Sequence, residues 1–157
     1  MKITLLLVGK TTNKHLDALI EDYRQRIAHY LPFEMTAIPE LKTAKSLSIE
    51  QQKEKEGELI LQQLKPGDNL ILLDERGDEY RSVEFAHFLT RQFLLPYRRI
   101  VFLIGGPYGF SQAVYGKCQT RVSLSQMTFS HQMIRLLFTE QLYRALTIMN
   151  GEPYHHE

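Results

Sequence analysis

Four side chains near the end of the sequence could carry proton-transfer chemistry. Glu140 and Arg144 lie four residues apart, a spacing at which a carboxylate and a guanidinium pair along one helix face. Tyr154 and His155 follow in a short terminal segment, and an imidazole that titrates near neutrality can accept a proton. A structural ion pair beside a disordered tail explains the same residues more simply, so these positions alone do not establish a catalytic site.

A run without charged side chains, residues 123–131, has the composition of a ligand-binding loop. Its sequence, SLSQMTFSH, mixes small hydroxyl side chains with apolar ones. Such a loop offers backbone donors, backbone acceptors and an apolar wall, which is what an adenine ring requires. The alternative is an ordinary strand-to-helix loop in which Ser130 is the N-cap.

Two glycine motifs invite a nucleotide-binding interpretation that their spacing does not support. Gly9-Lys10-Thr11 lacks the earlier glycine of a phosphate loop, because Thr4 stands at that position. Gly105-Gly106-Pro107-Tyr108-Gly109 follows an apolar run, but the spacing differs from the dinucleotide fingerprint. For the second motif, a tight turn and a ligand-contacting loop both remain open.

Composition excludes several classes of protein. The 157 residues include 19 Lys or Arg and 18 Asp or Glu, a net charge of +1, so bulk charge does not attract a polyanion. The single cysteine, Cys118, precludes an internal disulfide and suits a reducing compartment. No cysteine or carboxylate cluster accompanies the adjacent His155 and His156, so no metal is expected. The apolar run at 2–8 is too short for a signal peptide or a membrane span, which predicts a soluble, cytoplasmic protein.

The positions of these motifs depend on alternating strands and helices. Apolar runs and alternating patterns predict strands over 2–8, 33–38, 69–73, 99–104 and 120–124. Helical spacing and capping residues predict helices over 13–30, 48–64, 82–93, from 111 onward, and over 131–149, with Ser48 and Ser82 as caps. The alternation predicts one α/β domain, residues 1–157, with a mostly parallel sheet.

The last predicted helix is apolar over most of its circumference. A helix of this kind is buried on more than one side. One side would face the sheet, and a second copy of the chain would cover the other; burial within a single core is the alternative. His131, Arg135, Glu140, Arg144 and Thr147 would form a polar seam that meets solvent, a ligand or a partner.

Taken together, the motifs resemble the bacterial ribosomal RNA large-subunit methyltransferase H family. The resemblance rests on the order and spacing of MKITLLLVGK, LLDERG, LIGGPYG, SLSQMT, HQMIR, EQLYRA and the terminal PYHHE, and it extends over the whole chain. The family belongs to the SPOUT class. The resemblance therefore implies an α/β fold with a C-terminal trefoil knot, an exception to the rule against knotted topology, and a homodimer packed through the knot region.

The resemblance also implies a reaction. Family members transfer a methyl group from S-adenosylmethionine to N3 of a pseudouridine in the intersubunit-bridge stem-loop of 23S rRNA, and they act on the assembled 70S ribosome. The implied cofactor site comprises Leu73, Gly105, Leu124, Ser125, Gln126, Met127, Thr128 and Phe129, all uncharged. His155 or Glu140 would accept the N3 proton, Arg144 would favour the anion, and Tyr154 and His155 would come from the partner's tail.

Three positions depart from the family pattern. The loop at 40–46 lacks the usual glycine- and lysine-rich sequence, His156 replaces a frequent arginine, and Ser130 replaces a usual proline. The first two changes put contacts with RNA in doubt. Two other functions stay open: a ribosome-binding or assembly factor without catalysis, and 2′-O-methylation of another RNA by the same fold.

Overall fold

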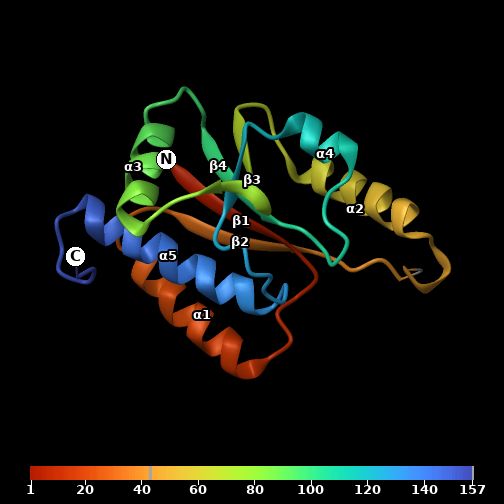
Figure 1. The fold of residues 1–157 in the computed structure, drawn as a ribbon, viewed down its shortest axis with the longest axis horizontal. Helices are drawn as coiled ribbons and strands as arrows, with labels where there is room; N and C mark the ends of the chain where they lie inside the picture. Colours follow the sequence, from red (N-terminus) through yellow and green to blue (C-terminus); the bar gives the residue numbers. More distant parts are fainter. Residues whose placement is uncertain (43, 157) are drawn as a thin grey trace.

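One parallel sheet organises the molecule (Figure 1). The computed structural model describes residues 1–42 and 44–156, so Thr43 of the 40–46 loop and Glu157 lie outside the described residues. The strands, in the spatial order β2-β1-β4-β3-β5, are β1 (Lys2–Val8), β2 (Phe33–Ile38), β3 (Asp68–Glu79), β4 (Arg99–Ile104) and β5 (Thr120–Ser123). Every pairing between these strands is parallel, which confirms the predicted sheet.

Helices cover both faces of the sheet (Figure 1). One face carries α1 (Lys14–Ile27), α3 (Ser82–Phe93) and α5 (Met133–Met149), and the other carries α2 (Ile49–Gln63) and the short α4 (Gln112–Lys117). A single 3₁₀ turn, η1 (Ala44–Ser46), precedes α2. Successive strand residues point to opposite faces, so Leu5 joins the apolar core under α1, α3 and α5, while Leu6 joins the core under α2 and α4. The result is a three-layer α/β/α arrangement.

Capping side chains set where several helices begin. The predicted capping box at Ser48 is present, because the Ser48 hydroxyl accepts from the Gln51 N–H and the Gln51 side chain accepts from the Ser48 N–H. The prediction that Ser82 caps α3 is wrong. Ser82 is the first helical residue, and the N–H of Arg81 before it donates to the Glu84 carboxylate at 2.7 Å.

The strand predicted over 69–73 is longer in the structure and continues as β3 to Glu79. Its register against β5 jumps between Leu73 and Asp78, so the intervening residues bulge out of the ladder. Within the bulge Gly77 lies directly over the β5 backbone, where a Cβ would be 2.6 Å from the carbonyl carbon of Arg121. The missing side chain at Gly77 therefore allows the bulge to stay paired with the short edge strand.

The predicted helix at 131–149 begins two residues later, at Met133. The Ser130 hydroxyl accepts from the Met133 N–H at 3.1 Å, so Ser130 does satisfy a donor at the helix entrance. At the other end the helix stops at Met149, and Gly151 takes a φ of +67°, the left-handed conformation that commonly terminates helices.

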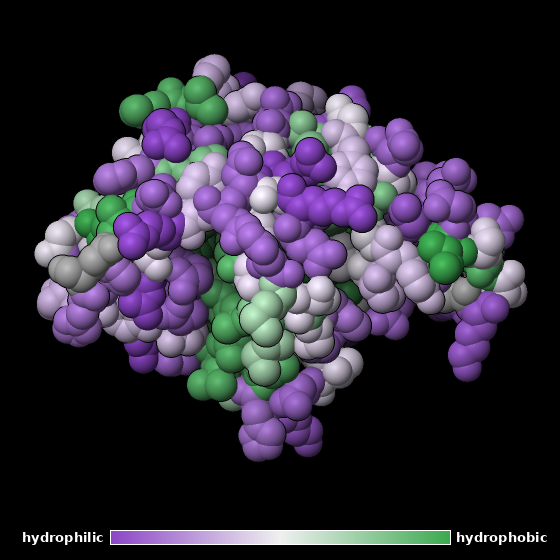
Figure 2. Space-filling view, viewed as in Figure 1, coloured by the Kyte–Doolittle hydropathy of each residue, from purple (hydrophilic) through white to green (hydrophobic). Residues whose placement is uncertain are grey.

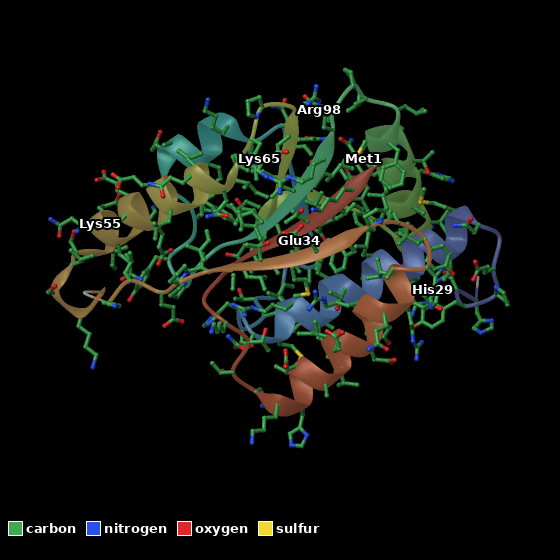
Figure 3. All side chains as sticks on the ribbon, turned by 180° about the vertical axis from the view of Figure 1, so that it is seen from behind. Met1, His29, Glu34, Lys55, Lys65 and Arg98 are labelled. Atoms are coloured by element: carbon green, nitrogen blue, oxygen red, sulfur yellow. The ribbon has the colours of Figure 1, made fainter. Side chains whose placement is uncertain are left out.

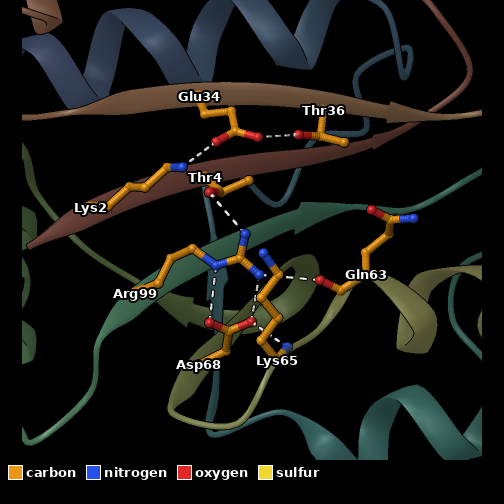
Figure 4. Close-up of polar contacts among 8 residues, drawn as sticks. All are labelled: Lys2, Thr4, Glu34, Thr36, Gln63, Lys65, Asp68 and Arg99. Atoms are coloured by element: carbon orange, nitrogen blue, oxygen red, sulfur yellow. Dashed lines mark hydrogen bonds and ion pairs between the residues drawn. The ribbon is translucent and has the colours of Figure 1, made fainter.

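Ion pairs connect neighbouring strands at the edge of the sheet where the strands begin (Figure 4). Arg99 of β4 donates two hydrogen bonds to the Asp68 carboxylate of β3, at 3.0 and 2.5 Å, and another to the Gln63 carbonyl oxygen at the end of α2. Lys2 of β1 pairs with Glu34 of β2. These ion pairs all lie at the edge of the sheet away from the carboxyl ends of the strands.

Basic side chains are spread over separate parts of the surface. Lys55, Lys65, His29 and Arg98 come from different segments and point outward in the view from behind (Figure 3). Within the described residues, no helix is long and apolar enough to span a bilayer.

Candidate functional site

A cavity of about 420 Å³ opens at the carboxyl ends of β3, β4 and β5, the edge where parallel sheets bind ligands. Three segments enclose it: the end of β3, the glycine loop after β4, and the loop between β5 and α5. The lining residues are Leu73, Asp74, Glu75, Ile104, Gly105, Gly106, Pro107, Gly109, Phe110, Tyr115, Leu124, Ser125, Met127, Thr128, Phe129, Ser130, His131 and Ile134.

Seven of the eight residues predicted to bind a cofactor line this cavity. Gln126 does not. Its amide donates to Glu79 at 2.8 Å, so this side chain ties the loop to the end of β3 instead of facing the cavity.

Unlike the eight predicted cofactor-binding residues, the wall of this cavity carries charge, because Asp74 and Glu75 are part of it. Asp74 accepts a hydrogen bond from Tyr115 at 2.9 Å, and Glu75 accepts one from Thr128 at 2.8 Å. Burial raises the pKa of Tyr115, and the hydrogen bond to Asp74 raises it further. The phenol therefore stays protonated and can donate. Carboxylates at a strand end are the groups that bind ribose hydroxyls in other α/β folds. Their place after a predicted buried strand is the signal that could have identified them.

The glycine loop after β4 is both a tight turn and a cavity wall. Gly106 and Gly109 form an isolated antiparallel bridge, and Gly109 takes a φ of +84°. A Cβ on Gly105 would lie 2.7 Å from the Phe110 ring, so this glycine allows close approach of backbone and ring. The structure therefore confirms the tight turn and puts the loop in the wall of the cavity, while contact with a ligand stays a prediction.

A buried arginine holds the entrance of α5 in place. Arg135 is fully buried and donates to the backbone oxygens of Val8 and His131, each at 2.9 Å, and to the Thr11 hydroxyl at 3.1 Å. Burial lowers the pKa of this guanidinium. The prediction that Arg135 and Thr147 belong to a polar seam facing solvent, a ligand or a partner is therefore wrong, because both side chains are buried in the interior. The Gly9-Lys10-Thr11 segment, in turn, anchors the helix.

Glu140, Arg144, Tyr154 and His155 do come together, and we call them the terminal cluster. Arg144 Nη2 donates to Glu140 Oε1 at 2.5 Å, and its Nη1 lies 3.0 Å from His155 Nδ1. The Tyr154 hydroxyl donates to the same Glu140 oxygen at 3.0 Å. Burial is the main cause that raises the pKa of Tyr154, and hydrogen bonds with Tyr23 and Glu140 raise it further. The phenol of Tyr154 therefore stays protonated at neutral pH.

The terminal segment, residues 150–156, is held against α1 and α5. Tyr30 donates to Glu152 at 2.6 Å, which raises the pKa of Tyr30 to about 12. The Tyr154 ring meets the Tyr143 ring edge-on, with centroids 4.7 Å apart. The tail therefore presents His155 in a defined place, in contrast to a free chain end.

Comparison with known proteins decides the family. A family model described as "Predicted SPOUT methyltransferase" matches residues 1–155. The chain belongs to the SPOUT methyltransferase family. Proteins named "Ribosomal RNA large subunit methyltransferase H" are similar to it over all 157 residues and over their own full length, at 60% identity in Phocaeicola vulgatus and 54% in Flavobacterium johnsoniae.

Among solved structures, one with a TM-score above 0.5 shows a similar fold. A probable methylase family protein from Haemophilus influenzae matches 99% of this chain and 70% of its own, with a TM-score of 0.55 and 13% identity. The SpoU methyltransferase AviRb from Streptomyces viridochromogenes, solved in complex with AdoMet, matches 96% of this chain and 58% of its own, with a TM-score of 0.47 and 16% identity. Family membership implies the trefoil knot, which stays a prediction for this chain.

In this SPOUT methyltransferase the terminal cluster does not line the cavity of its own chain. Ile134 lines the cavity, and Arg144 follows ten residues later on the same helix. At a rise of about 1.5 Å per residue, the two positions are about 15 Å apart along α5. The residues predicted to bind the cofactor and those predicted to move a proton therefore form two separate groups within one chain.

Proposed function

We propose that this protein methylates 23S rRNA, transferring a methyl group from S-adenosylmethionine to N3 of a pseudouridine in the assembled ribosome. The observation that carries the proposal is full-length identity of 54–60% to proteins named for large-subunit ribosomal RNA methylation. The atom, the nucleoside and the assembled substrate come from the family resemblance.

The residues around the cavity suit S-adenosylmethionine. About 420 Å³ is within the range of small-molecule sites. Leu73, Ile104 and Leu124 would pack against the adenine, while Asp74 and Glu75 would accept hydrogen bonds from the ribose hydroxyls. When bound, S-adenosylmethionine supplies an electrophilic methyl group.

The terminal cluster supplies the groups that the nucleophile needs. The pseudouridine N3 is a weak acid and must lose its proton before it attacks the methyl carbon. His155 or Glu140 accepts that proton, while Tyr154, protonated at neutral pH, and the Arg144 guanidinium stabilise the anion by hydrogen bonding and charge.

A second copy of the chain would bring the cluster to the cavity. The two groups are about 15 Å apart along α5 in one chain, so the tail of one subunit would serve the cavity of the other. A homodimer also agrees with the apolar patch that Figure 2 shows over the N-terminal parts of α1 and α5. Leu19 and Met133 of these helices are 49% and 41% exposed.

Methyl transfer from labelled S-adenosylmethionine tests the proposal. Ribosomes with an unmethylated bridging stem-loop and free rRNA would be compared, and the modified nucleoside would be identified by digestion and mass spectrometry. We expect label on N3-methylpseudouridine from ribosomes alone. Label on a ribose 2′-oxygen, or ribosome association without label, would replace this function by 2′-O-methylation or by an assembly role.

A further inference from the structure

A buried carboxyl group lies behind the glycine loop and is not used by the mechanism above. Glu56 of α2 is 7% exposed, and its carboxyl group packs against Gly106, one of the residues that line the cavity. A Cβ on Gly106 would be 2.7 Å from Glu56 Oε1, so the carboxyl group occupies the space that a side chain at this position would fill. One layer of loop backbone therefore separates Glu56 from the cavity.

The packing of α2 against the loop holds Glu56 in this place. Glycine is unfavourable inside a helix, yet Gly57 stands in the middle of α2. A Cβ on Gly57 would collide with the Ser111 hydroxyl, which caps α4 directly after the glycine loop. Glu56 contacts Gly106 near the start of the same segment. Two neighbouring residues of α2 thus contact both ends of the segment, and together they fix the approach of the helix to the loop.

The charge of Glu56 has no cationic partner. Burial is the main cause that raises the pKa of Glu56, and the charge of Glu40 raises it further. Its Oε2 accepts a hydrogen bond from Gln52 at 3.1 Å, and Gln52 is a neutral donor. Within the described residues, no Lys, Arg or His forms an ion pair with Glu56. An uncompensated buried charge costs stability, and ionisable groups in such surroundings are concentrated at functional sites.

We propose that Glu56 is a specificity-determining residue that favours S-adenosylmethionine over the product, S-adenosylhomocysteine. The inference rests on the proposed function, because it concerns the cofactor of that reaction. As the bond from N3 to the methyl carbon forms, the bond from sulfur to that carbon breaks and its electron pair stays on sulfur. The cationic sulfonium thereby becomes a neutral thioether. A fixed negative charge behind the cavity wall attracts the sulfonium and has no such effect on the thioether.

The wall of the cavity suits a cation. Asp74 and Glu75 line it, and the lining residues within the described part of the chain include neither Lys nor Arg. Charges in an enclosed cavity interact more strongly than charges in water, because protein screens them less. Glu56 itself does not line the cavity, so it contributes charge without a direct hydrogen bond to the cofactor. Its effect therefore depends on the charge of the ligand and not on the shape of the ligand.

Removal of the charge without a change of shape tests the inference. In Glu56→Gln the carboxamide has the size of the carboxyl group and can still accept the hydrogen bond from Gln52. At a separation of about 10 Å and an effective dielectric constant of about 20, one unit charge changes the affinity for a cation by roughly tenfold. We therefore expect the dissociation constant of S-adenosylmethionine to rise roughly tenfold, while that of S-adenosylhomocysteine stays unchanged.

Two further variants separate the charge of Glu56 from its packing. Glu58→Gln removes the same charge from an exposed position on α2 and should change neither dissociation constant, because solvent and salt screen an exposed charge. Glu56→Asp keeps the charge and should retain most of the preference for S-adenosylmethionine. Calorimetric titration of the wild type and the three variants with each ligand gives the ratio of the two dissociation constants.

That ratio decides the outcome. If Glu56→Gln leaves both dissociation constants unchanged, or raises both equally, the inference is overturned, because the residue then acts only through the shape of the loop. A preference lost as fully in Glu56→Asp as in Glu56→Gln would also overturn it. The titrations need no RNA. Absence of rRNA methylation by a wild type that prefers S-adenosylmethionine would therefore remove the proposed substrate and leave the role of Glu56 in place.

Discussion

At the scale of single residues, ionisable groups in this protein are held by specific partners. Arg144 contacts both Glu140 and His155, and Tyr154 shares the Glu140 oxygen. Because a guanidinium only donates, His155 Nδ1 accepts from Arg144, and the neutral ring carries its proton on Nε2. As a proton acceptor, His155 would take the substrate proton at Nδ1, in place of the hydrogen bond from Arg144.

His155→Ala tests that role. We expect turnover to fall by about 100-fold or more, the usual contribution of a positioned base, with cofactor affinity unchanged. His156→Ala, at the exposed neighbouring position, is the matched control and should keep most of the activity. Calorimetric titration with S-adenosylmethionine and single-turnover methylation would give the two quantities. Loss of cofactor binding in His155→Ala would show that the residue acts elsewhere.

Glu56 on α2 predicts a pH-dependent stability. Burial is the main cause that raises the pKa of Glu56 above its ordinary 4.5, with nearby Glu40 adding to the effect and a hydrogen bond from Gln52 opposing it. A raised pKa contributes stability that is present below pH 4.5 and is lost as pH rises through the folded-state pKa. Each unit of such a shift corresponds to about 1.4 kcal/mol of the free energy of unfolding.

Glu56→Gln should therefore gain stability over the wild type as the pH rises to neutrality, and should differ little near pH 4. Urea unfolding at the two pH values measures the effect. Glu58→Gln, exposed on the same helix, should show no such trend. A variant whose stability relative to the wild type does not change with pH would refute the proposed desolvation of Glu56.

At the scale of elements, the bulge in β3 shapes the cavity that we propose binds the cofactor. It lies between Leu73 and Asp78, and it carries both Asp74 and Glu75 into the wall. Hydrogen bonds from Tyr115 and Thr128 connect these carboxylates to α4 and to the loop between β5 and α5. The position of the bulge depends on the close approach of Gly77 to β5.

Gly77→Ala should destabilise the protein by about 1–3 kcal/mol, the usual cost of forcing extra atoms into a packed site. It should also weaken cofactor binding, because the bulge would move. Gly116→Ala on α4 is the contrasting variant: a Cβ there meets nothing within 4 Å, and alanine should stabilise by about 0.5–1 kcal/mol. Thermal unfolding of both variants is the measurement, and equal midpoints would contradict the argument.

At the scale of the whole molecule, α5 connects the parts of the site. Its entrance is anchored by Arg135, its first turn lines the cavity through Ile134, and its end carries Arg144. One side packs on the sheet through buried Phe138, and the patch over α1 and α5 remains exposed in a single chain. A homodimer would cover that patch and bring two sites together.

Met133→Glu should convert the proposed dimer to a monomer, because a desolvated, unpaired carboxylate opposes burial of the apolar face. Sedimentation of the wild type should give a mass of about twice 18.4 kDa, and sedimentation of the variant should give the mass of one chain. Leu94→Glu is the control, since Leu94 is 81% exposed at the end of α3, away from α5. The interface over α1 and α5 would be excluded if the wild type sediments as a monomer, or if the Met133→Glu variant still sediments as a dimer. Methylation by the monomeric variant should also fall if the tail serves the second copy.

Local patterns in the sequence determined the type and order of the elements. Apolar runs and alternating residues identify β1 and β4, and the Ser48 capping box identifies the start of α2, because each signal acts between near neighbours. The spacing of Glu140 and Arg144 predicts their ion pair for the same reason. The resemblance to a family added the prediction of which segments bind the cofactor.

Only the tertiary structure decided features that depend on contacts between distant segments. The extension of β3 to Glu79 requires pairing with β5, more than 40 residues away. The burial of Arg135 requires the carbonyl of Val8, 127 residues away, and no helical periodicity encodes that partner. The charge of the pocket wall likewise follows from which strand ends meet at one edge of the sheet. Local periodicity records which face of an element is apolar, but the fold determines what that face meets.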